Sequence, residues 1–335
     1  MTSEVTAAPL KPPPSNEVIA GRSRRKRWTF DRISFFAVFL GLPLAIYLIF
    51  VVSPFVQAFY YSLTNWSGFS AVVQFVGFEN YSRIFQDQLF LKALGNNIIL
   101  LLVVPLVTIT IALIFAIMVT IGGPSRGQIR GLKGSSFYRV VSFFPYVIPA
   151  IAIGLIWSFV YMPGSGLLNG ILTGLGAGWA ENFAWLGNES TAMAVTIFVI
   201  IWGLVGFYMV LFIAAIKSIP AEFYEAARVD GAGRFRTAVM ITVPLLRNNI
   251  QTAAIYLGIL ALDAFVYMAA LNPIGGPNNS TWVMSQQIFQ VGFINGQAGL
   301  ACAMGVVLAV LTLIFAGIVF FINWLTGGRK ERVRR

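Results

Sequence analysis

The sequence is short of charge, histidine and cysteine, and each shortage excludes a class of protein. Only 10% of the 335 residues are charged and 58% are apolar, whereas about a quarter of the residues in a soluble domain carry charge. The chain has no histidine, so it lacks the commonest general base and the commonest metal ligand. Cys302 is the single cysteine, which excludes an intramolecular disulfide and a paired-thiolate metal site. We therefore expect an all-α integral membrane protein without catalytic residues or a metal site.

Long stretches without charged residues predict six transmembrane helices. About 20 apolar residues are needed to cross about 30 Å of hydrocarbon, and the gap between Arg32 and Glu79 alone exceeds that length. The fifth and sixth spans share one long gap that a polar segment divides, and Asp263 is the only charge within it. The predicted spans cover residues 33–57, 96–121, 140–162, 191–216, 248–271 and 298–325.

The positions of the basic residues predict the orientation of the chain. With six spans, 21 of the 23 Lys and Arg residues fall on one side, and only Arg83 and Lys92 fall on the other. The positive-inside rule then places both termini in the cytoplasm. The basic clusters adjoin hydrophobic spans, so we expect a lipid membrane and no nucleic acid as their partner. The predicted parts are a disordered basic tail at 1–32, a membrane domain at 33–325 and a basic tail at 326–335.

The cytoplasmic loop at 217–247 contains the signals of a short helix. Pro220 suits the first helical position, where its missing N–H is not needed. Glu222 in the first turn and Arg228 near the last turn both agree with the helix dipole. Gly231 fits the residue just past the end, where a left-handed backbone is favourable. These signals predict a helix that lies outside the membrane bundle.

One face of this helix is a candidate contact surface. Phe223, Ala226 and Ala227 share a face by their helical spacing. Two alanines beside an aromatic ring form a nearly flat surface of small side chains, which a groove on another protein can approach closely. An amphipathic helix that rests on lipid headgroups has the same pattern, and the residues alone leave both interpretations open.

A resemblance favours the protein contact. Glu225, Ala226 and Ala227, followed by Gly231, Ile241 and Pro244, resemble the EAA signature of permease subunits of binding-protein-dependent ABC importers. Val243 stands where leucine is usual, which is a conservative departure. Residues 219–232 are similar to the carbohydrate-uptake branch of that family, the maltose and glycerol-phosphate type. The resemblance extends over about residues 40–325 through segments 61–66, 75–81, 144–149, 163–166 and 275–277, with Trp157, Thr281, Gly299 and Ala301.

The resemblance implies a type I ABC importer permease fold in a bacterial plasma membrane. Its implied partners are a second permease subunit in a heterodimer, a dimer of cytoplasmic ATPase subunits, an extracytoplasmic solute-binding protein and a sugar. The ATPase would use ATP and Mg, because this chain has no phosphate-binding loop of the G-x-x-x-x-G-K-[ST] type and is expected to bind no cofactor. The short helix would dock on the ATPase through Tyr224, Glu225, Ala226, Ala227, Asp230 and Gly231.

Asp263 is the candidate for contact with the solute. An ionisable residue inside a span costs free energy in lipid, and such residues are therefore rare and usually functional. Tyr256, Leu260, Asp263 and Tyr267 share one face at spacings of four, three and four residues, and aromatic rings with a carboxylate suit sugar recognition. The alternative is that Asp263 is a buried link between helices, to a tyrosine or to a partner subunit. The neighbouring face could equally line the path; it consists of Leu257, Leu260, Ala261 and Ala264.

Other functions and one outer segment stay open at this point. A secondary transporter or channel for a small polar solute is the main alternative, although one intramembrane carboxylate supports it weakly and no internal repeat is evident. An intramembrane enzyme lacks histidine and paired acids. The uncharged segment 272–297 either contacts a solute-binding protein or is a solvated loop.

Overall fold

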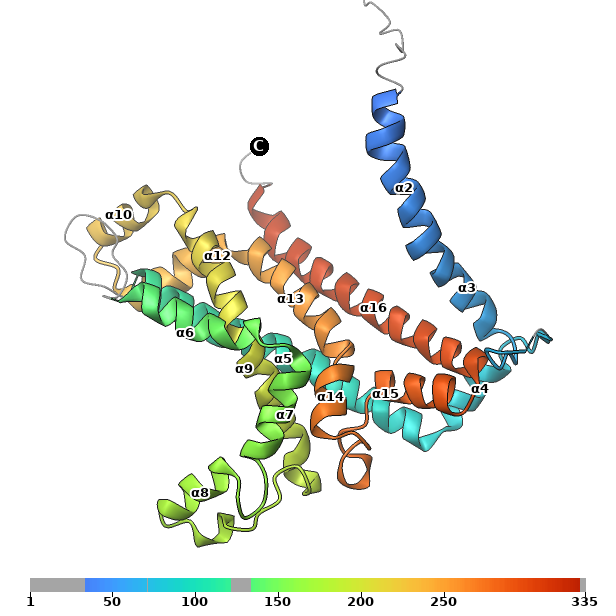
Figure 1. Cartoon of the computed structure of the whole chain (residues 1–335). Helices are drawn as coiled ribbons and strands as arrows, with labels where there is room; N and C mark the ends of the chain where they lie inside the picture. Colours follow the sequence, from blue (N-terminus) through green and yellow to red (C-terminus); the bar gives the residue numbers. More distant parts are fainter. Residues whose placement is uncertain (1–33, 71, 122–133, 332–335) are drawn as a thin grey trace, which may run out of the picture. The chain divides into compact units, whose positions relative to one another are not determined.

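The computed structural model describes residues 34–70, 72–121 and 134–331, and these residues are almost entirely helical (Figure 1). A single antiparallel bridge between Thr64 and Phe75 is the one extended pairing in that part of the chain. The predicted tail at 1–32 and residues 332–335 lie outside the described residues.

The chain divides into two compact units, Met1–Pro54 and Phe55–Arg335. The described part of the first unit is one helical run that contains the π-helical turns η1 (Ala37–Gly41) and η2 (Leu48–Val52) around α2 (Leu42–Tyr47). Together with α3 (Ser53–Ser62) it forms an apolar helix over Ser34–Ser62 that is long enough to cross a membrane.

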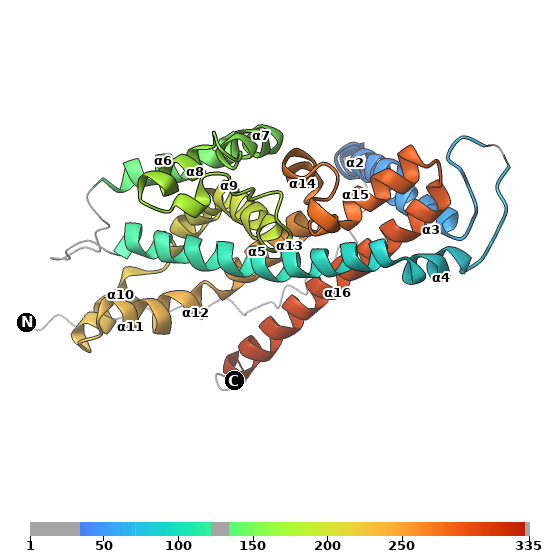
Figure 2. The same cartoon turned by 90° about the horizontal axis from the view of Figure 1, so that it is seen from below.

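The second unit contains three further long apolar helices, α5 (Gln88–Ile121), α9 (Glu189–Lys217) and α16 (Ala298–Glu331). α5 packs along α9 and α13 (Arg247–Leu262), and α13 also packs on α16 (Figure 2). α5 begins eight residues before the predicted start of its span at 96, because Gln88 and the following residues continue the helix beyond its apolar part.

The remaining two predicted spans are bent. α6 (Ser135–Val147) and α7 (Ala150–Val160) meet at 98°, and α13 and α14 (Phe265–Leu271) meet at 46°. The first break has a local cause, because Pro149 forces the preceding Ile148 into an extended backbone with ψ 132°. Among the described residues, four helices are long enough to span alone, and the number is six if each bent pair forms one span. The predicted count of six agrees with the larger of these two numbers.

Small residues let the helices of the second unit approach closely. A Cβ atom at Gly206 of α9 would lie 1.7 Å from the backbone oxygen of Ser142 in α6. Only glycine permits that approach, which is the usual role of small residues between membrane helices. The core between α5, α9 and α13 is built from large apolar side chains such as Leu100, Phe212 and Leu257, all fully buried.

The shorter elements connect the long helices, and four of them follow α9. This helix has 29 residues and is therefore about 43 Å long. The segment that follows its last residue, Lys217, contains α10 (Ala221–Val229), α11 (Arg234–Thr237), the π-helical turn η4 (Ala238–Thr242) and α12 (Val243–Leu245). The remaining short elements are α4 (Glu79–Gln86), α8 (Leu167–Gly174), η3 (Gly178–Ala180), η5 (Pro277–Asn279), α15 (Met284–Phe289) and η6 (Gln290–Ile294).

Candidate functional site

The predicted loop helix is α10, and its ends follow from local sequence. The helix begins at Ala221, so Pro220 lies just before the first helical residue instead of on it. Glu222 is in the first turn and Arg228 in the last, as predicted. A helix of nine residues is too short to be stable alone in water, so its position depends on contacts with the rest of the chain.

Gly231 ends α10 in the predicted left-handed conformation, with φ +70°. The N–H of Gly231 donates to the carbonyl of Arg228 at 3.1 Å, and the N–H of Ala232 donates to the carbonyl of Ala227 at 2.8 Å. This pair of bonds is a Schellman motif, which satisfies the last carbonyl groups of a helix. The motif fixes the direction in which the chain leaves α10.

Tyr224 and Ala227 attach α10 to its own chain. Both side chains are buried, and Tyr224 belongs to the core between α5, α9 and α13. The Tyr224 hydroxyl forms a hydrogen bond of 3.3 Å with the hydroxyl of Thr242, which is fully buried in η4. Burial raises the pKa of Tyr224 above its ordinary value, and the bond to Thr242 offsets part of that rise. The tyrosine therefore stays a neutral link between α10 and η4, the turn that precedes the fifth span.

The opposite side of α10 is exposed and differs from the predicted face. Phe223 and Ala226 are exposed, but Ala227 is turned inwards with Tyr224. Val229, which is 88% exposed, completes the apolar ridge in place of Ala227. The interpretation of Phe223, Ala226 and Ala227 as one surface was wrong, because two of these residues face outwards and the third packs on the bundle. Glu225 lies exposed beside the ridge.

The four residues predicted to line a solute path do not share one helix face. The helix breaks at Asp263, whose backbone has φ −100° and ψ 46°. Tyr256 and Leu260 before the break and Asp263 at the break are exposed. Tyr267 belongs to α14, is half-buried and packs against the core. The break ends the helical spacing, and this is why the predicted alignment fails beyond Asp263.

The structure also reduces the number of fifth-span residues that can line a solute path. Leu257, Ala261 and Ala264 are at most 2% exposed and pack within the bundle, so of the neighbouring face only Leu260 is open. Asp263 itself is exposed, and no side chain in the described ranges bonds to its carboxylate. Within the described part of the chain, Asp263 therefore forms no side-chain link to another helix, and the path residues that stay exposed are Tyr256, Leu260 and Asp263.

Sequence reasoning missed Asn97, which holds the broken span in place. Its amide nitrogen donates to the carbonyl of Leu262 at 3.1 Å, and its amide oxygen accepts from the N–H of Met284 at 2.8 Å. Asn97 is fully buried in α5. The neighbouring Asn96 donates to the carbonyl of Trp282 at 2.8 Å. Two adjacent amides in an otherwise apolar span were the available signal, since polar groups inside a membrane need partners.

Segment 272–297, which the sequence places outside the cell, is not a solvated loop. Its part from Thr281 to Gln287 is largely buried, and α15 packs against α5 and α16. Gln286 donates to the carbonyl of Asn272 at 3.1 Å, and the indole of Trp282 donates to Gln287 at 2.6 Å. The amide-rich composition therefore reflects internal hydrogen bonds at this end of the bundle. Asn278 and Asn295 remain exposed.

The acidic residues and the cysteine do not form a cluster that could bind a metal in the described part of the chain. Within residues 34–70, 72–121 and 134–331, no three side chains of the His, Cys, Asp or Glu type lie together as a metal site would require. Lys92 and Glu189 form an exposed ion pair of 3.8 Å between the starts of α5 and α9.

Solved structures support the arrangement of the helices. A chain in the crystal structure of a bacterial alginate ABC transporter, in complex with an alginate pentasaccharide-bound periplasmic protein, superposes with a TM-score of 0.74. The match covers 90% of this chain and 98% of that chain at 22% sequence identity. At this identity the likeness establishes the fold, an all-α ABC importer permease fold.

Sequence comparisons identify the family. The chain is 58% identical to the diacetylchitobiose uptake system permease protein of Streptomyces coelicolor, over 94% of this chain and 89% of that protein. It is 32% identical to the multiple sugar-binding transport system permease protein of Streptococcus mutans, over 82% and 89%. It is 30% identical to the sn-glycerol-3-phosphate transport system permease protein of Salmonella typhimurium, over 83% and 90%. Residues 118–327 match the family model itself. The chain belongs to the family of inner membrane components of binding-protein-dependent transport systems.

Proposed function

We propose that this chain is a permease subunit of an ATP-driven sugar importer and that α10 docks on a cytoplasmic ATPase subunit. One observation carries the proposal: α10 has an exposed ridge of Phe223, Ala226 and Val229 beside Glu225, while Tyr224 ties its inner side to the bundle. Family membership favours this function over the alternative of a secondary transporter or channel.

The attachment of α10 suits the transmission of movement. Tyr224 joins the helix to Thr242 at the start of the fifth span, and the Schellman motif at Gly231 fixes the connection to α11. A displacement of α10 would therefore pass to α13, which leads to the break at Asp263. Coupling requires contacts that differ between two states of the transporter, and closure of the ATPase dimer would supply that difference.

The remaining partners follow from the same proposal. Both termini and α10 would face the cytoplasm, as the basic residues indicate. A second, different permease subunit would complete the path, because Tyr256, Leu260 and Asp263 are open on this chain alone. The ATP and Mg would be bound by the ATPase subunits. A solute-binding protein would deliver the sugar at the end of the bundle that carries α15.

The names of the relatives support a sugar as the solute. The relative of 58% identity is named for diacetylchitobiose uptake, and another is named for multiple sugars. We propose a small oligosaccharide and take diacetylchitobiose as the first candidate. Its rings would pack on Tyr256, and its hydroxyl and amide groups would donate hydrogen bonds to Asp263, in the usual manner of an apolar site with a few polar groups.

Purification of the full-length chain from its own host tests this function. We expect an ATPase subunit and a second permease to co-purify with it. Proteoliposomes that contain this complex should take up diacetylchitobiose only when the solute-binding protein is outside and ATP is inside. Uptake that proceeds without ATP, or purification without an ATPase, would contradict the proposal.

Asp263→Asn and Asp263→Leu test the path. We expect Asn, which keeps a hydrogen-bonding oxygen, to retain part of the uptake. Leu should reduce it by about tenfold or more, which corresponds to the loss of one hydrogen bond to a charged group. Basal ATPase activity and membrane content serve as the controls. A fully active Leu variant would remove Asp263 from the path.

A further inference from the structure

The lobe between α7 and α9, residues 163–188, carries an exposed apolar stripe. It contains α8 and η3 and lies beyond the end of α7 (Figure 1). Leu167, Ile171 and Leu175 follow one another at a spacing of four residues, so they share one side of α8. They are between 51% and 80% exposed, and Trp179 of η3 is also exposed. The lobe therefore presents apolar side chains outwards.

The lobe turns its polar groups inwards. Asn169 is 1% exposed, and its amide nitrogen donates to the carbonyls of Glu181 at 3.2 Å and Phe183 at 3.0 Å. Its amide oxygen accepts from the indole N–H of Trp185 at 2.6 Å. The N–H of Gly164 also donates to the carbonyl of Glu181, at 2.9 Å. Backbone groups in lipid must find partners within the protein, whereas a loop in water can leave them to the solvent. Apolar side chains outside and bonded polar groups inside are what a segment in contact with lipid needs.

The outward side of the lobe offers few groups for bonds to another protein. No charged residue occurs between Arg139 and Glu181. From residue 163 to residue 180, Ser165 and Trp179 are the only exposed side chains with a hydrogen-bonding group. A protein interface carries about one hydrogen bond per 100–200 Å² and has a polar rim. An uncharged apolar surface with a tryptophan at its edge is instead typical of the boundary of a bilayer.

The base of the lobe lies close to the end of a membrane span. Tyr161, at the end of α7, donates its hydroxyl to the carbonyl of Val195 at 3.4 Å. Val195 is six residues past the start of α9 at Glu189, which is about 9 Å along the helix. Leu168 of α8 packs against the buried cluster that contains Tyr161. Since the hydrocarbon layer is about 30 Å thick, α8 is attached near the level where lipid meets water.

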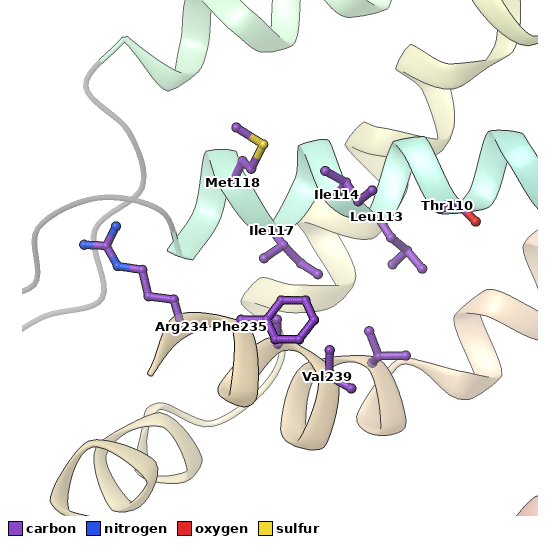
Figure 3. A pocket seen from close by; sticks show the side chains of 10 residues that line it. Thr110, Leu113, Ile114, Ile117, Met118, Arg234, Phe235 and Val239 are labelled. Carbon is purple, nitrogen blue, oxygen red and sulfur yellow. The ribbon is translucent and has the colours of Figure 1, made fainter. Parts of the chain in front are cut away.

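The stripe differs from the apolar groove between α5 and the segment that follows α10. In that groove Phe235 and Val239 lie opposite Ile117 of α5 (Figure 3), so this chain supplies two walls. The side chains of the stripe instead project from α8 and are more than half exposed. The stripe therefore suits contact with a broad apolar medium.

We propose that α8 is an interfacial helix, with Leu167, Ile171 and Leu175 among the acyl chains at the edge of the bilayer and Trp179 at the level of the headgroups. Interfacial helices bury their apolar side about 5–10 Å into the boundary between headgroups and acyl chains. The predicted orientation assigns this boundary to the outer leaflet. The lobe then holds the adjoining ends of α7 and α9 at a fixed depth. This proposal depends on the membrane environment alone and not on the docking of α10.

Site-directed spin labelling measures what surrounds the stripe. The full-length chain, in the complex with which it purifies, is placed in nanodiscs of phosphatidylcholine and phosphatidylglycerol. A nitroxide is coupled to an unnatural ketone residue at position 171, 175 or 182. Oxygen concentrates in lipid, whereas a nickel chelate stays in water. We expect oxygen to collide with the label more often than the nickel chelate does at 171 and 175. The reverse is expected at Asn182, an exposed polar residue of the same lobe.

The two reagents separate the possible surroundings of the stripe. If a second permease or a solute-binding protein covered it, neither reagent would reach positions 171 and 175. If the lobe were a solvated loop, the nickel chelate would dominate at these positions as it does at 182. Either outcome would overturn the proposal.

Ile171→Glu tests whether the stripe holds the lobe in the bilayer. A carboxylate is costly in lipid, so we expect the ratio of oxygen to nickel collisions of a label at 175 to invert. Ile171→Met keeps an apolar side chain and should leave that ratio unchanged, as should Asn182→Glu, which adds the same charge on the polar side of the lobe. A label at 175 that stays in lipid beside Ile171→Glu would refute the anchoring role. These measurements need neither uptake nor ATP, so a failure of α10 to touch an ATPase would leave their result intact.

Discussion

Two short helices at opposite ends of the bundle, α10 and α15, are attached in different ways. α10 turns Tyr224 and Ala227 inwards and leaves most of its surface exposed. α15 and the residues before it are largely buried and are joined to α5 by two hydrogen bonds. Asn96 donates to the carbonyl of Trp282, and the N–H of Met284 donates to Asn97. The difference indicates that α15 moves with the bundle as one body. α10 instead presents a surface that a partner can hold.

The largest expected effect comes from Asn97→Leu, which loosens the attachment of α15 to α5. The substitution leaves the carbonyl of Leu262 and the N–H of Met284 without partners in a buried place. Each unsatisfied group costs about 1–3 kcal/mol, so we expect the free energy of unfolding to fall by about 2–6 kcal/mol. Thermal unfolding of the purified complex measures it.

Gln290→Leu is the matched control for that variant. Gln290 belongs to the same outer segment, but its amide bonds to Asn295 at the surface, so its loss should change stability by less than about 1 kcal/mol. Equal stability of the two variants would mean that α15 is not fixed to the bundle through Asn97.

The next effect tests the exposed side of α10 with Glu225→Lys. If the ATPase holds Glu225 by a polar or ionic contact, a reversed charge places like charges together, which costs several kcal/mol. We expect ATP-dependent uptake to fall about a hundredfold, equivalent to about 2.7 kcal/mol, with normal amounts of the chain in the membrane. Glu222→Lys reverses an exposed charge one turn earlier and should have a smaller effect. Normal uptake by the Glu225 variant would exclude this residue from docking.

Gly231→Val tests the exit from α10 and should have a smaller effect. A Cβ atom at this position meets nothing within 4 Å, so the cost comes only from the backbone at φ +70°, about 1–2 kcal/mol for a residue other than glycine. We expect a roughly tenfold loss of uptake with unchanged membrane insertion. Gly231→Asn, which tolerates the left-handed backbone, should keep most of the activity; equal losses would show that the turn geometry is unimportant.

The same comparison explains what the sequence can predict. The ends of α10 follow from nearby residues, namely Pro220, Glu222 and Gly231, and the six spans follow from gaps in charge. Local signals of this kind can be read from a single chain. The inward turn of Ala227 could not, because it depends on which side of α10 meets the bundle.

The end of the bundle that carries α15 depends on contacts between distant parts of the chain. Asn97 bonds to Leu262 and Met284, which are 165 and 187 positions away in the sequence. The break at Asp263 has no local signal either, because neither proline nor glycine lies beside it. The helical spacing from Tyr256 to Tyr267 therefore predicted a face that the break removes. The role of the remaining path residues stays a prediction.

The smallest expected effect comes from Tyr224→Phe, which tests how the buried side of α10 is attached to the bundle. Tyr224→Phe keeps the buried ring and removes only its 3.3 Å hydrogen bond with Thr242, which is worth about 1 kcal/mol. We expect uptake to fall less than tenfold, while ATP hydrolysis continues and becomes less dependent on the solute-binding protein. Thr242→Val removes the same bond from the other side, and the double variant should be no worse than either single one. If the two losses instead add, the hydroxyl groups act separately, and α10 is joined to the fifth span by packing alone.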